Sequence, residues 1–378
     1  MIIQSKNVWI DGQFVPAQIE VNEDKISAIF EYGSRKPDFD YGEDRVVPGF
    51  IDVHTHGAYG FETNDGDEKG LIEWMSRLPK EEGVTAFLPS TITQSREVLS
   101  KALINVRKVM NDKHDGAEIL GVHFEGPYID VKYKGAQPEQ YIVKPDIEEL
   151  KYYQSVSDNV IKYITMAPEH DEGMKFIRYC HDNGIIVTLG HSNATYEDAV
   201  NAVSNGASCM THVFNGMTPL NHRKPGLAGA ALRMRDVYGE LICDGYHVTP
   251  VVMNLFFHAK GADHGIMITD SLACKGLPKG EYTSGGLAIK VMDDGTARLV
   301  DSGNLAGSTL KMCKGIQITV EKAGVPFEYA LNACTCNPAK LMHVDDRKGY
   351  LKVGYDADII ILNRDYDVID AFARGVRQ

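Results

Sequence analysis

The sequence has little of what marks a nucleic-acid-binding or membrane protein. Its 378 residues carry 39 Lys and Arg against 52 Asp and Glu, a formal net charge of −13. Phosphate backbones and anionic lipid surfaces attract positive protein surfaces, so we expect no nucleic-acid and no membrane partner. No apolar run approaches the ~18 residues of a membrane-spanning helix, and the first residues, MIIQSKNVWIDGQF, lack a signal-peptide pattern.

Cysteine is scarce and scattered. The chain has seven cysteines and no CxxC pair, and the closest two are Cys334 and Cys336. An odd, dispersed set argues against a disulfide framework or a zinc ribbon and favours reduced thiols. We therefore expect a cytoplasmic protein, in which Cys209 and Cys243 lie within apolar runs as packing residues.

A glycine-rich phosphate loop is also missing after the first apolar run of the middle region. What the middle has is a repeated alternation of short apolar runs with helical stretches such as PEHDEGMKFIRYCHDN. The eight runs, read as strands, are residues 46–54, 83–91, 117–125, 160–169, 184–192, 207–215, 239–247 and 264–270. This rhythm predicts an α/β fold, a (β/α)8 TIM-like barrel, in preference to a doubly wound sheet.

The two ends of the chain have a different pattern. NVWIDGQFVPAQIEVNEDKISAIFE alternates apolar and polar residues, with Asp11-Gly12 as a hairpin signal, and GYLKVGYDADIIILN does the same near the C-terminus. We expect residues 1–46 plus 348–378 to form one small, discontinuous β-sandwich domain. Residues 47–347 would then form the barrel.

Polar residues follow the predicted strands at an unusual set of positions. These are His54, His56, Glu125, His191, His212 and Asp270. The carboxyl ends of barrel strands meet at one mouth, and alternation places His54 and His56 on the same side of their strand. Taken singly, each histidine could be a core or rim residue, and Glu125 or Asp270 could cap a helix. Taken together they predict a metal site.

Imidazole and carboxylate ligands suit zinc or iron better than magnesium or calcium. A bound Lewis-acid ion makes hydroxide available near neutral pH, and an aspartate at the mouth can move the protons. Asp270 is the candidate for that role. The pattern predicts metal-assisted hydrolysis of an amide or a related bond. The other histidines considered, His114, His170, His181, His258 and His343, are expected on surface helices or loops.

Several sequence blocks carry a family resemblance. PGFIDVHTHG, followed by the later histidines and aspartate, resembles the amidohydrolase superfamily. HFEGPYID, KGAQPEQYI, APE, TLGHSNA, THVFNGMTPLNHRKPG, DGYHV, ITDS and NLAGSTL resemble, more narrowly and in the same order, the family of N-acetylglucosamine-6-phosphate deacetylases. The resemblance spans nearly the whole chain, and the EGP, THxFN and LAGS blocks are its specific parts.

The resemblance implies a ligand set for a divalent metal. Glu125, His191 and His212 would hold one ion. Some members of the family lack His54 and His56, but this chain has both, so one or two ions per subunit are expected, with Glu125 as a possible bridge. No lysine ends the third or fourth strand, so a carboxylated lysine is not expected as the bridge.

The resemblance also implies a small-molecule sugar phosphate with an N-acetyl group as substrate. Asn215 and Gly216 would meet its phosphate, with Arg223 and His247 as cationic partners. Because that arginine can reach the neighbouring subunit's site in the family, a homodimer is implied. Ala136 and Gln137 of KGAQPEQY, together with Leu305, Ala306 and Gly307, would contact the sugar.

Alternatives remain open at three points. The segment HRK could be a solvated basic loop, and residues 305–307 could be a helix start behind the capping residues Ser302 and Asn304. Gln137 stands where many relatives have a histidine, which leaves the choice between gluco and galacto sugars open. The main expectation is deacetylation of N-acetylglucosamine 6-phosphate. Its rivals are an N-acetylgalactosamine-6-phosphate deacetylase, a cyclic-amide hydrolase and a catalytically silent binding protein.

Overall fold

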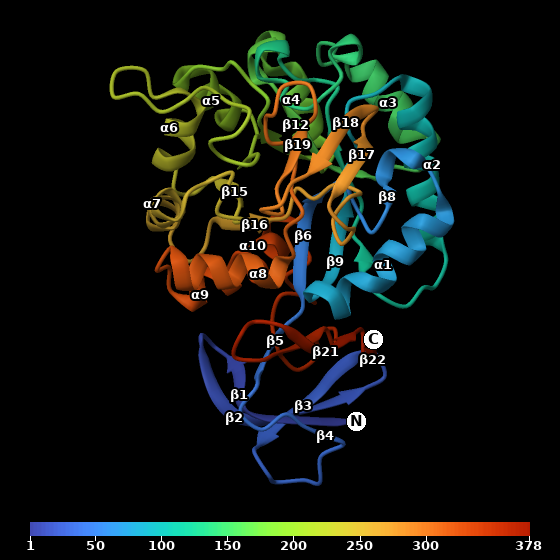
Figure 1. Ribbon diagram of the computed structural model, residues 1–378, viewed down its shortest axis with the longest axis vertical. Coiled ribbons are helices and arrows are strands. Elements are labelled where there is room, and N and C mark those ends of the chain that lie inside the picture. The colour runs from blue at the N-terminus through green and yellow to red at the C-terminus, as the bar shows by residue number, and fades with distance from the viewer.

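The computed structural model describes residues 1–378, and its central strands run parallel (Figure 1). They form a three-stranded sheet in the order β10-β9-β6 and a six-stranded sheet in the order β11-β12-β13-β14-β15-β16. The strands are β6 (Phe50–Thr55), β9 (Val84–Pro89), β10 (Glu118–Ile119), β11 (Val122–Glu125), β12 (Ile161–Met166), β13 (Ile186–Leu189), β14 (Cys209–Met210), β15 (Tyr238–Ile242) and β16 (Gly265–Ile268). A mixed α/β class with parallel central strands is confirmed.

The two parallel sheets meet at two seams. A parallel bridge pairs Ser90, just after β9, with His123 on β11. At the other seam, the Asp270 amide donates to the His54 carbonyl at 2.9 Å, and the His56 amide donates to the Ser271 carbonyl at 2.9 Å. The last strand therefore contacts the first.

Helices connect and cover these strands. They are α1 (Glu68–Glu82), α2 (Arg96–Asn111), α3 (Ile147–Val156), α4 (Lys175–Asp182), α5 (Tyr196–Ser204), α6 (Gly226–Arg233), α7 (Pro250–Lys260), α8 (Met312–Gln317), α9 (Phe327–Asn332) and α10 (Cys336–Leu341). Short helical turns occur at η1 (Thr63–Asp65), η2 (Val131–Tyr133), η3 (Glu139–Tyr141), η4 (Pro168–His170), η5 (Glu172–Met174) and η6 (Ile318–Lys322). None of the helices combines the length and apolar composition needed to cross a membrane.

Local sequence explains where helices begin and end. The Asp67 side chain accepts a hydrogen bond from the Lys69 amide at the start of α1, and Gly83, with φ 83°, ends that helix. At α5, Thr195 and Asp198 form a reciprocal capping box. These caps fix the turns that connect helices to the strands bearing the polar residues.

The two ends of the chain share one hydrogen-bonded sheet, which lies below the helices in Figure 1 and holds both termini. Its order is β22-β21-β20-β5-β1-β2-β3, with β4 beside β1. The strands are β1 (Ile2–Ile10), β2 (Gln13–Asn22), β3 (Lys25–Glu31), β4 (Phe39–Asp40), β5 (Arg45–Pro48), β20 (Ile359–Leu362), β21 (Val368–Ala373) and β22 (Val376–Arg377).

Alternate residues of β20 face two different hydrophobic clusters. Ile359 and Ile361 pack in a cluster built only from the terminal segments, whereas Ile360 and Leu362 pack in the main cluster under the helices. The terminal sheet thus has a small core of its own and a second face that packs on the rest of the protein.

The apolar run 46–54 is two strands rather than the single strand we expected. Val46 and Val47 belong to β5 in the terminal sheet, and the central strand β6 starts at Phe50. Pro48 has no amide hydrogen to continue a ladder. A side chain on Gly49 would lie 2.1 Å from Thr85 Oγ1, so the chain can cross between the sheets only at a glycine.

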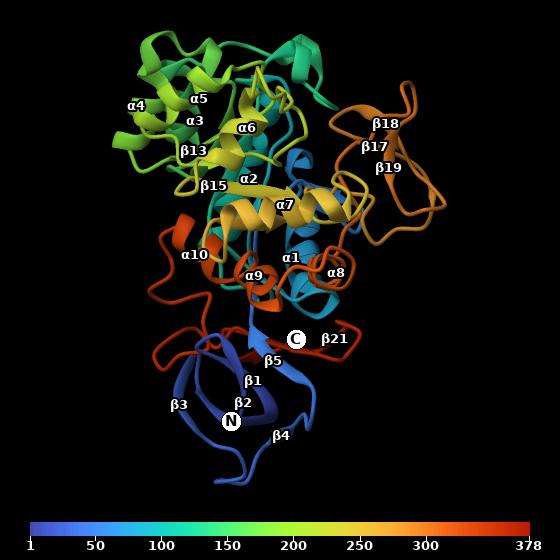
Figure 2. The ribbon, with the colours of Figure 1, turned by 90° about the vertical axis from the view of Figure 1, so that its left-hand side faces the viewer.

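A small antiparallel sheet, which the sequence patterns did not predict, follows β16. It comprises β17 (Gly280–Ser284), β18 (Leu287–Val291) and β19 (Ala297–Leu299), and it projects to one side of the helices in Figure 2. A two-stranded sheet of β7 (Gly57–Ala58) and β8 (Phe61–Glu62) follows β6. All seven cysteines are buried and free, as the absence of a disulfide framework predicted.

Lys348 forms a buried ionic junction between the terminal and central sheets. Its Nζ lies 2.6 Å from Asp358, 2.8 Å from Glu118 on β10 and 2.9 Å from Asp356, and its side chain is 1% exposed. Burial acts to raise the pKa of Asp356 and Glu118, but Lys348 and Arg347 outweigh it and lower each to about 2.

Replacing Lys348 with methionine should lower the free energy of unfolding by about 3–5 kcal/mol, because buried carboxylates lose their partner. Denaturant titration measures this, with Lys322→Met at an exposed position as the control. The carboxylates are ionised above their unfolded pKa of about 4, so the difference should be full there and shrink as the pH falls toward 2. Equal stability of Lys348→Met and wild type at pH 7 would contradict this role.

Candidate metal centre and substrate cavity

A cavity opens at the carboxyl ends of the central strands. Its lining residues are His56, Ile92, Glu125, Gly135, Ala136, Gln137, His191, His212, Asn215, Gly216, Ile242, His247, Asp270, Leu272, Ser284, Leu287, Ile289, Leu305, Ala306 and Gly307. Every site residue predicted from the sequence lines this cavity except His54 and Arg223. His54 is fully buried and contacts Glu125, whereas Arg223 is exposed on the loop before α6.

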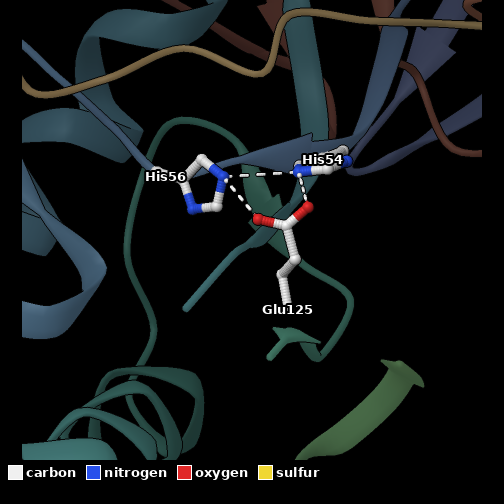
Figure 3. A group of neighbouring side chains, drawn as sticks. All are labelled: His54, His56 and Glu125. Atoms are coloured by element: carbon white, nitrogen blue, oxygen red, sulfur yellow. Dashed lines mark hydrogen bonds and ion pairs between the residues drawn. The ribbon is translucent and has the colours of Figure 1, made fainter. Parts of the chain in front are cut away.

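The first group of converging side chains is His54, His56 and Glu125 (Figure 3). The His54 Nε2 atom lies 3.3 Å from Glu125 Oε1, and the His56 Nε2 atom lies 3.3 Å from Glu125 Oε2. The two Nε2 atoms are 3.3 Å apart. Asp270 Oδ1 lies 3.1 Å from His56 Nε2 and 3.5 Å from His54 Nε2, so Asp270 borders this group.

The second group shares Glu125 with the first and adds His191 and His212. Both Nε2 atoms lie 3.3 Å from Glu125 Oε1, and they are 3.0 Å from each other. Glu125 ends β11, and the two histidines follow β13 and β14. The single carboxylate is therefore shared by two sets of imidazoles, the arrangement expected for a bridging ligand.

The outer nitrogen of each imidazole has an oxygen acceptor. The Nδ1 atoms of His56, His191 and His212 donate to the carbonyls of Ser90 at 3.3 Å, Tyr133 at 2.7 Å and Asn215 at 3.1 Å. A carbonyl can only accept, so each Nδ1 carries a hydrogen, and in the neutral ring each Nε2 then presents a lone pair. His54 Nδ1 lies 3.0 Å from the carboxylate of Glu240, with the same consequence.

These lone pairs and carboxylates fit a metal ion. Glu125 Oε1 is buried and has no hydrogen-bond partner in the protein, although three Nε2 atoms face it at 3.3 Å. Lone pairs that face one another repel, and a cation between them removes this repulsion. Imidazole and carboxylate together are a donor set for zinc or iron. An orphaned oxygen inside such a set is the signature of a metal-binding position.

The electrostatics of these side chains also favour added positive charge. Burial acts to lower the pKa of His56, but Asp270 and Glu125 outweigh it and raise it to about 9. Burial acts to raise the pKa of Asp270, but His54 and His56 lower it below its usual range. Asp270 is therefore an ionised carboxylate that can accept a proton.

Three of the polar residues have a left-handed backbone. The φ angles are 46° for His191, 25° for His212 and 48° for Asp270. Such conformations are costly for residues with a side chain and cluster at functional sites. Nearby, a Cβ on Gly216 would lie 2.9 Å from His191 Nδ1, and one on Gly307 would lie 2.8 Å from the Asp270 carbonyl, so both positions require glycine.

Gln137 holds the Glu125 carboxylate. Its amide nitrogen donates to Glu125 Oε2 at 2.7 Å, and its amide oxygen accepts from the Thr93 amide at 2.7 Å. The residue is 4% exposed but reaches the cavity wall. Its contact with a substrate stays a prediction, whereas its contact with Glu125 is a feature that sequence reasoning missed.

His247 brings an imidazole to the cavity. Its Nδ1 donates to Asp244 at 2.6 Å. Burial acts to lower the pKa of His247, but Asp244 outweighs it and raises it. The Asp244 carboxylate also accepts the backbone amides of Tyr246 and His247 at 2.8 Å. An imidazolium held in this way can bind an anion.

Sequence reasoning missed a polar layer beneath the ligands. Glu240 on β15 contacts His54, and His123 is held between Ser90 Oγ at 3.0 Å and Thr165 Oγ1 at 2.7 Å. Glu240 stands as the one charged residue in the apolar run GELIC, which was an available signal. Seven apolar or small lining residues were missed as well: Ile92, Gly135, Ile242, Leu272, Ser284, Leu287 and Ile289.

Comparison with known proteins agrees with this chemistry. Residues 45–377 match the Amidohydrolase family. The chain is 40% identical over 364 residues to an N-acetylglucosamine-6-phosphate deacetylase of Bacillus subtilis, covering 94% of this chain and 91% of that one. It is 33% identical to an N-acetylgalactosamine-6-phosphate deacetylase of Escherichia coli O157:H7, covering 87% and 86%.

A solved structure is also similar throughout. It is a mutant of N-acetyl-D-glucosamine-6-phosphate deacetylase from Mycobacterium smegmatis in complex with N-acetyl-D-glucosamine-6-phosphate. The TM-score is 0.94 at 27% identity, and the alignment covers 100% of this chain and 98% of that one.

Removing bound metal with a chelator should destabilise the protein, because the buried carboxylates and lone pairs lose their counter-charge. Adding zinc at about 100 times its Kd should restore about 2.7 kcal/mol. Calorimetry with elemental analysis measures both. The Glu125→Gln variant is the matched control and should respond far less. Unfolding curves that are identical with and without bound metal would contradict the assignment.

Proposed function

This chain belongs to the amidohydrolase family, and we propose that it hydrolyses the acetamide of N-acetylglucosamine 6-phosphate to glucosamine 6-phosphate and acetate. The observation that carries this proposal is the arrangement at the cavity. The pair His54 and His56 and the pair His191 and His212 share Glu125. The ionised Asp270 carboxylate lies 3.1 Å from His56 Nε2. The relatives named N-acetylglucosamine-6-phosphate deacetylase support the substrate.

The chain has the ligand side chains that metal-dependent hydrolysis requires. Glu125, His191 and His212 would hold one ion, and His54 and His56 would hold a second with Glu125 as the bridge. Zinc or iron fits this donor set. When bound, such an ion acts as a Lewis acid that polarises the acetyl carbonyl and acidifies water.

Asp270 moves the proton. As an ionised carboxylate it accepts a proton from the attacking water, whose oxygen forms the new bond to the acetyl carbon. Asp270 then delivers this proton to the sugar nitrogen as the carbon–nitrogen bond breaks, so that acetate and the free amine leave. The Asp270 amide and carbonyl are bound to His54 and Ser308 at 2.9 and 2.7 Å, which holds the carboxylate in place.

Other residues of the cavity would bind the sugar phosphate. The imidazolium of His247 would pair with the phosphate, and Asn215 and Gly216 would add amide groups. Leu305, Ala306 and Gly307 would line the sugar, because the Ser308 amide ties their loop to the Asp270 carbonyl. Ala136 and Gln137 lie on the cavity wall as well.

We propose a (β/α)8 barrel at residues 47–347 and a small β domain at residues 1–46 plus 348–378, with the last two residues of β5, Val47 and Pro48, continuing into the sheet of the small domain. The backbone bonds from Asp270 to His54 and from His56 to Ser271 support a closed ring of strands, and the separate terminal core supports the small domain. The seven free, buried cysteines are consistent with a cytoplasmic protein.

We propose a homodimer in which Arg223 serves the partner's cavity. Arg223 is exposed and does not line the cavity of its own chain. Exposed apolar side chains lie near it in sequence and on α7: Leu220 is 55% exposed, Leu255 58% and Val251 73%. An arginine that reaches across an interface would add a second cation for the phosphate.

The second candidate substrate is N-acetylgalactosamine 6-phosphate. The Escherichia coli relative of that name supports it. Gln137 stands where many relatives have a histidine. Its amide oxygen accepts from the Thr93 amide and its amide nitrogen donates to Glu125. A panel of the two sugars, with and without phosphate, decides between them, and we expect the highest kcat/KM for N-acetylglucosamine 6-phosphate.

Changing Asp270 to asparagine should lower kcat by about 10²–10⁴, because the proton acceptor and donor is lost. Acetate release measures the rate, and elemental analysis should find metal content near that of wild type. His258→Ala, on the exposed face of α7, is the control and should keep full activity. Retained turnover in Asp270→Asn would refute the role.

Changing His247 to alanine should raise KM for the phosphorylated sugar by about 10- to 100-fold, which corresponds to the loss of one charged hydrogen bond. The unphosphorylated sugar should show almost no change, since it lacks the anion. Asp244→Asn should give a smaller effect of the same kind. A similar loss for both sugars would show that His247 serves another purpose.

Mixing the Arg223→Ala variant with the Asp270→Asn variant should restore activity if Arg223 acts across the dimer. Each mixed dimer would contain one cavity with Asp270 from one chain and Arg223 from the other. Steady-state assays at low substrate after subunit exchange measure this, and light scattering gives the mass. A monomeric mass, or no gain on mixing, would remove the proposal.

A further inference from the structure

Glu240 is a buried carboxylate without a lysine or arginine partner. It lies on β15, is 0% exposed, and belongs to neither group of converging ligands. Buried carboxylates are costly unless they are paired. Its contacts indicate what compensates for the burial.

Three hydrogen bonds converge on this side chain. Glu240 Oε2 lies 3.0 Å from His54 Nδ1 and accepts the His212 backbone amide at 3.1 Å. Glu240 Oε1 accepts the Tyr163 hydroxyl at 2.7 Å. The Glu240 carboxylate therefore contacts both ligand groups. It contacts the ring of His54 in the group with His56, and the backbone amide of His212 in the group with His191.

The contact with His54 fixes the tautomer and the orientation of that ring. The carboxylate requires a hydrogen on Nδ1, so the lone pair lies on Nε2, which faces Glu125 Oε1 at 3.3 Å. A carboxylate behind a histidine also makes its other nitrogen a stronger donor to a metal. The other three imidazoles have only neutral carbonyls behind them. His54 is thus the one ligand with a charged support.

We propose that Glu240 is a positioning residue that makes His54 a metal ligand, so that filling of the His54–His56–Glu125 position depends on it. This rests on the proposed metal-dependent function. In the other position, the rings of His191 and His212 are held by the backbone carbonyls of Tyr133 and Asn215, so neither ring is oriented by the Glu240 side chain. Loss of Glu240 should therefore affect the two positions unequally.

Zinc titration of the apo-protein, followed by elemental analysis, tests this. Wild type should bind two ions per chain, and Glu240→Gln should keep one tight ion while binding the other about 10- to 100-fold more weakly. Glu240→Asp shortens the side chain by one carbon and should likewise weaken binding of one ion. This variant replaces Glu240→Gln in the test if the glutamine variant does not fold. Tyr163→Phe removes the other side-chain partner of Glu240 and should leave both affinities near wild type.

A double-mutant comparison separates positioning from general stability. Adding Glu240→Gln to His54→Asn should cause no further loss of zinc affinity, because Glu240 acts through His54. Wild-type affinity for both ions in Glu240→Gln, equal loss of both ions, or a wild type that binds a single ion would overturn the inference. A wild type that binds two ions but releases no acetate would refute the proposed function and leave the role of Glu240 standing.

Discussion

The site depends on one electrostatic constraint: four imidazole lone pairs and two carboxylates share a buried space that needs a cation. Three Nε2 atoms face Glu125 Oε1 at 3.3 Å, and that oxygen has no hydrogen-bond partner. In water these groups would be solvated separately, but buried they are stable only with added positive charge. A metal ion bound between these side chains would supply that charge.

The fold meets this constraint by taking its ligands from the ends of parallel strands. Glu125 ends β11, and the histidines and Asp270 lie within two residues of the ends of β6, β13, β14 and β16. Strand ends are rigid, and every outer imidazole nitrogen is held by an oxygen. The left-handed backbone of His191, His212 and Asp270 raises the conformational energy, and the surrounding structure stabilises it. Rigidity of this kind lets the cation site exist before substrate arrives.

Sequence patterns predicted most strands and the polar side chains that converge at the cavity, because both leave local signals. An apolar run ending in a polar residue is visible in HFEGP or TLGHS without any tertiary information. The division of residues 46–54 into β5 and β6 was not visible, since it depends on how closely Gly49 approaches Thr85. The sheet β17–β19 was missed because its strands alternate buried and exposed residues over only three to five positions.

Long-range contacts limited what the sequence could reveal about the site. The Gln137 bond to Glu125 joins side chains 12 residues apart, and the Glu240 contact with His54 joins residues 186 apart. No local pattern encodes such pairs. Arg223 was predicted for the cavity, but the structure leaves it outside the cavity of its own chain, and a single chain cannot complete an interface.

The most direct measurement is anomalous diffraction from crystals of the purified protein at the zinc and iron absorption edges. The account predicts two anomalous peaks on either side of Glu125, one beside His54 and His56 and the other beside His191 and His212. An anomalous map without a peak near Glu125, from crystals grown with zinc or iron present, would contradict it.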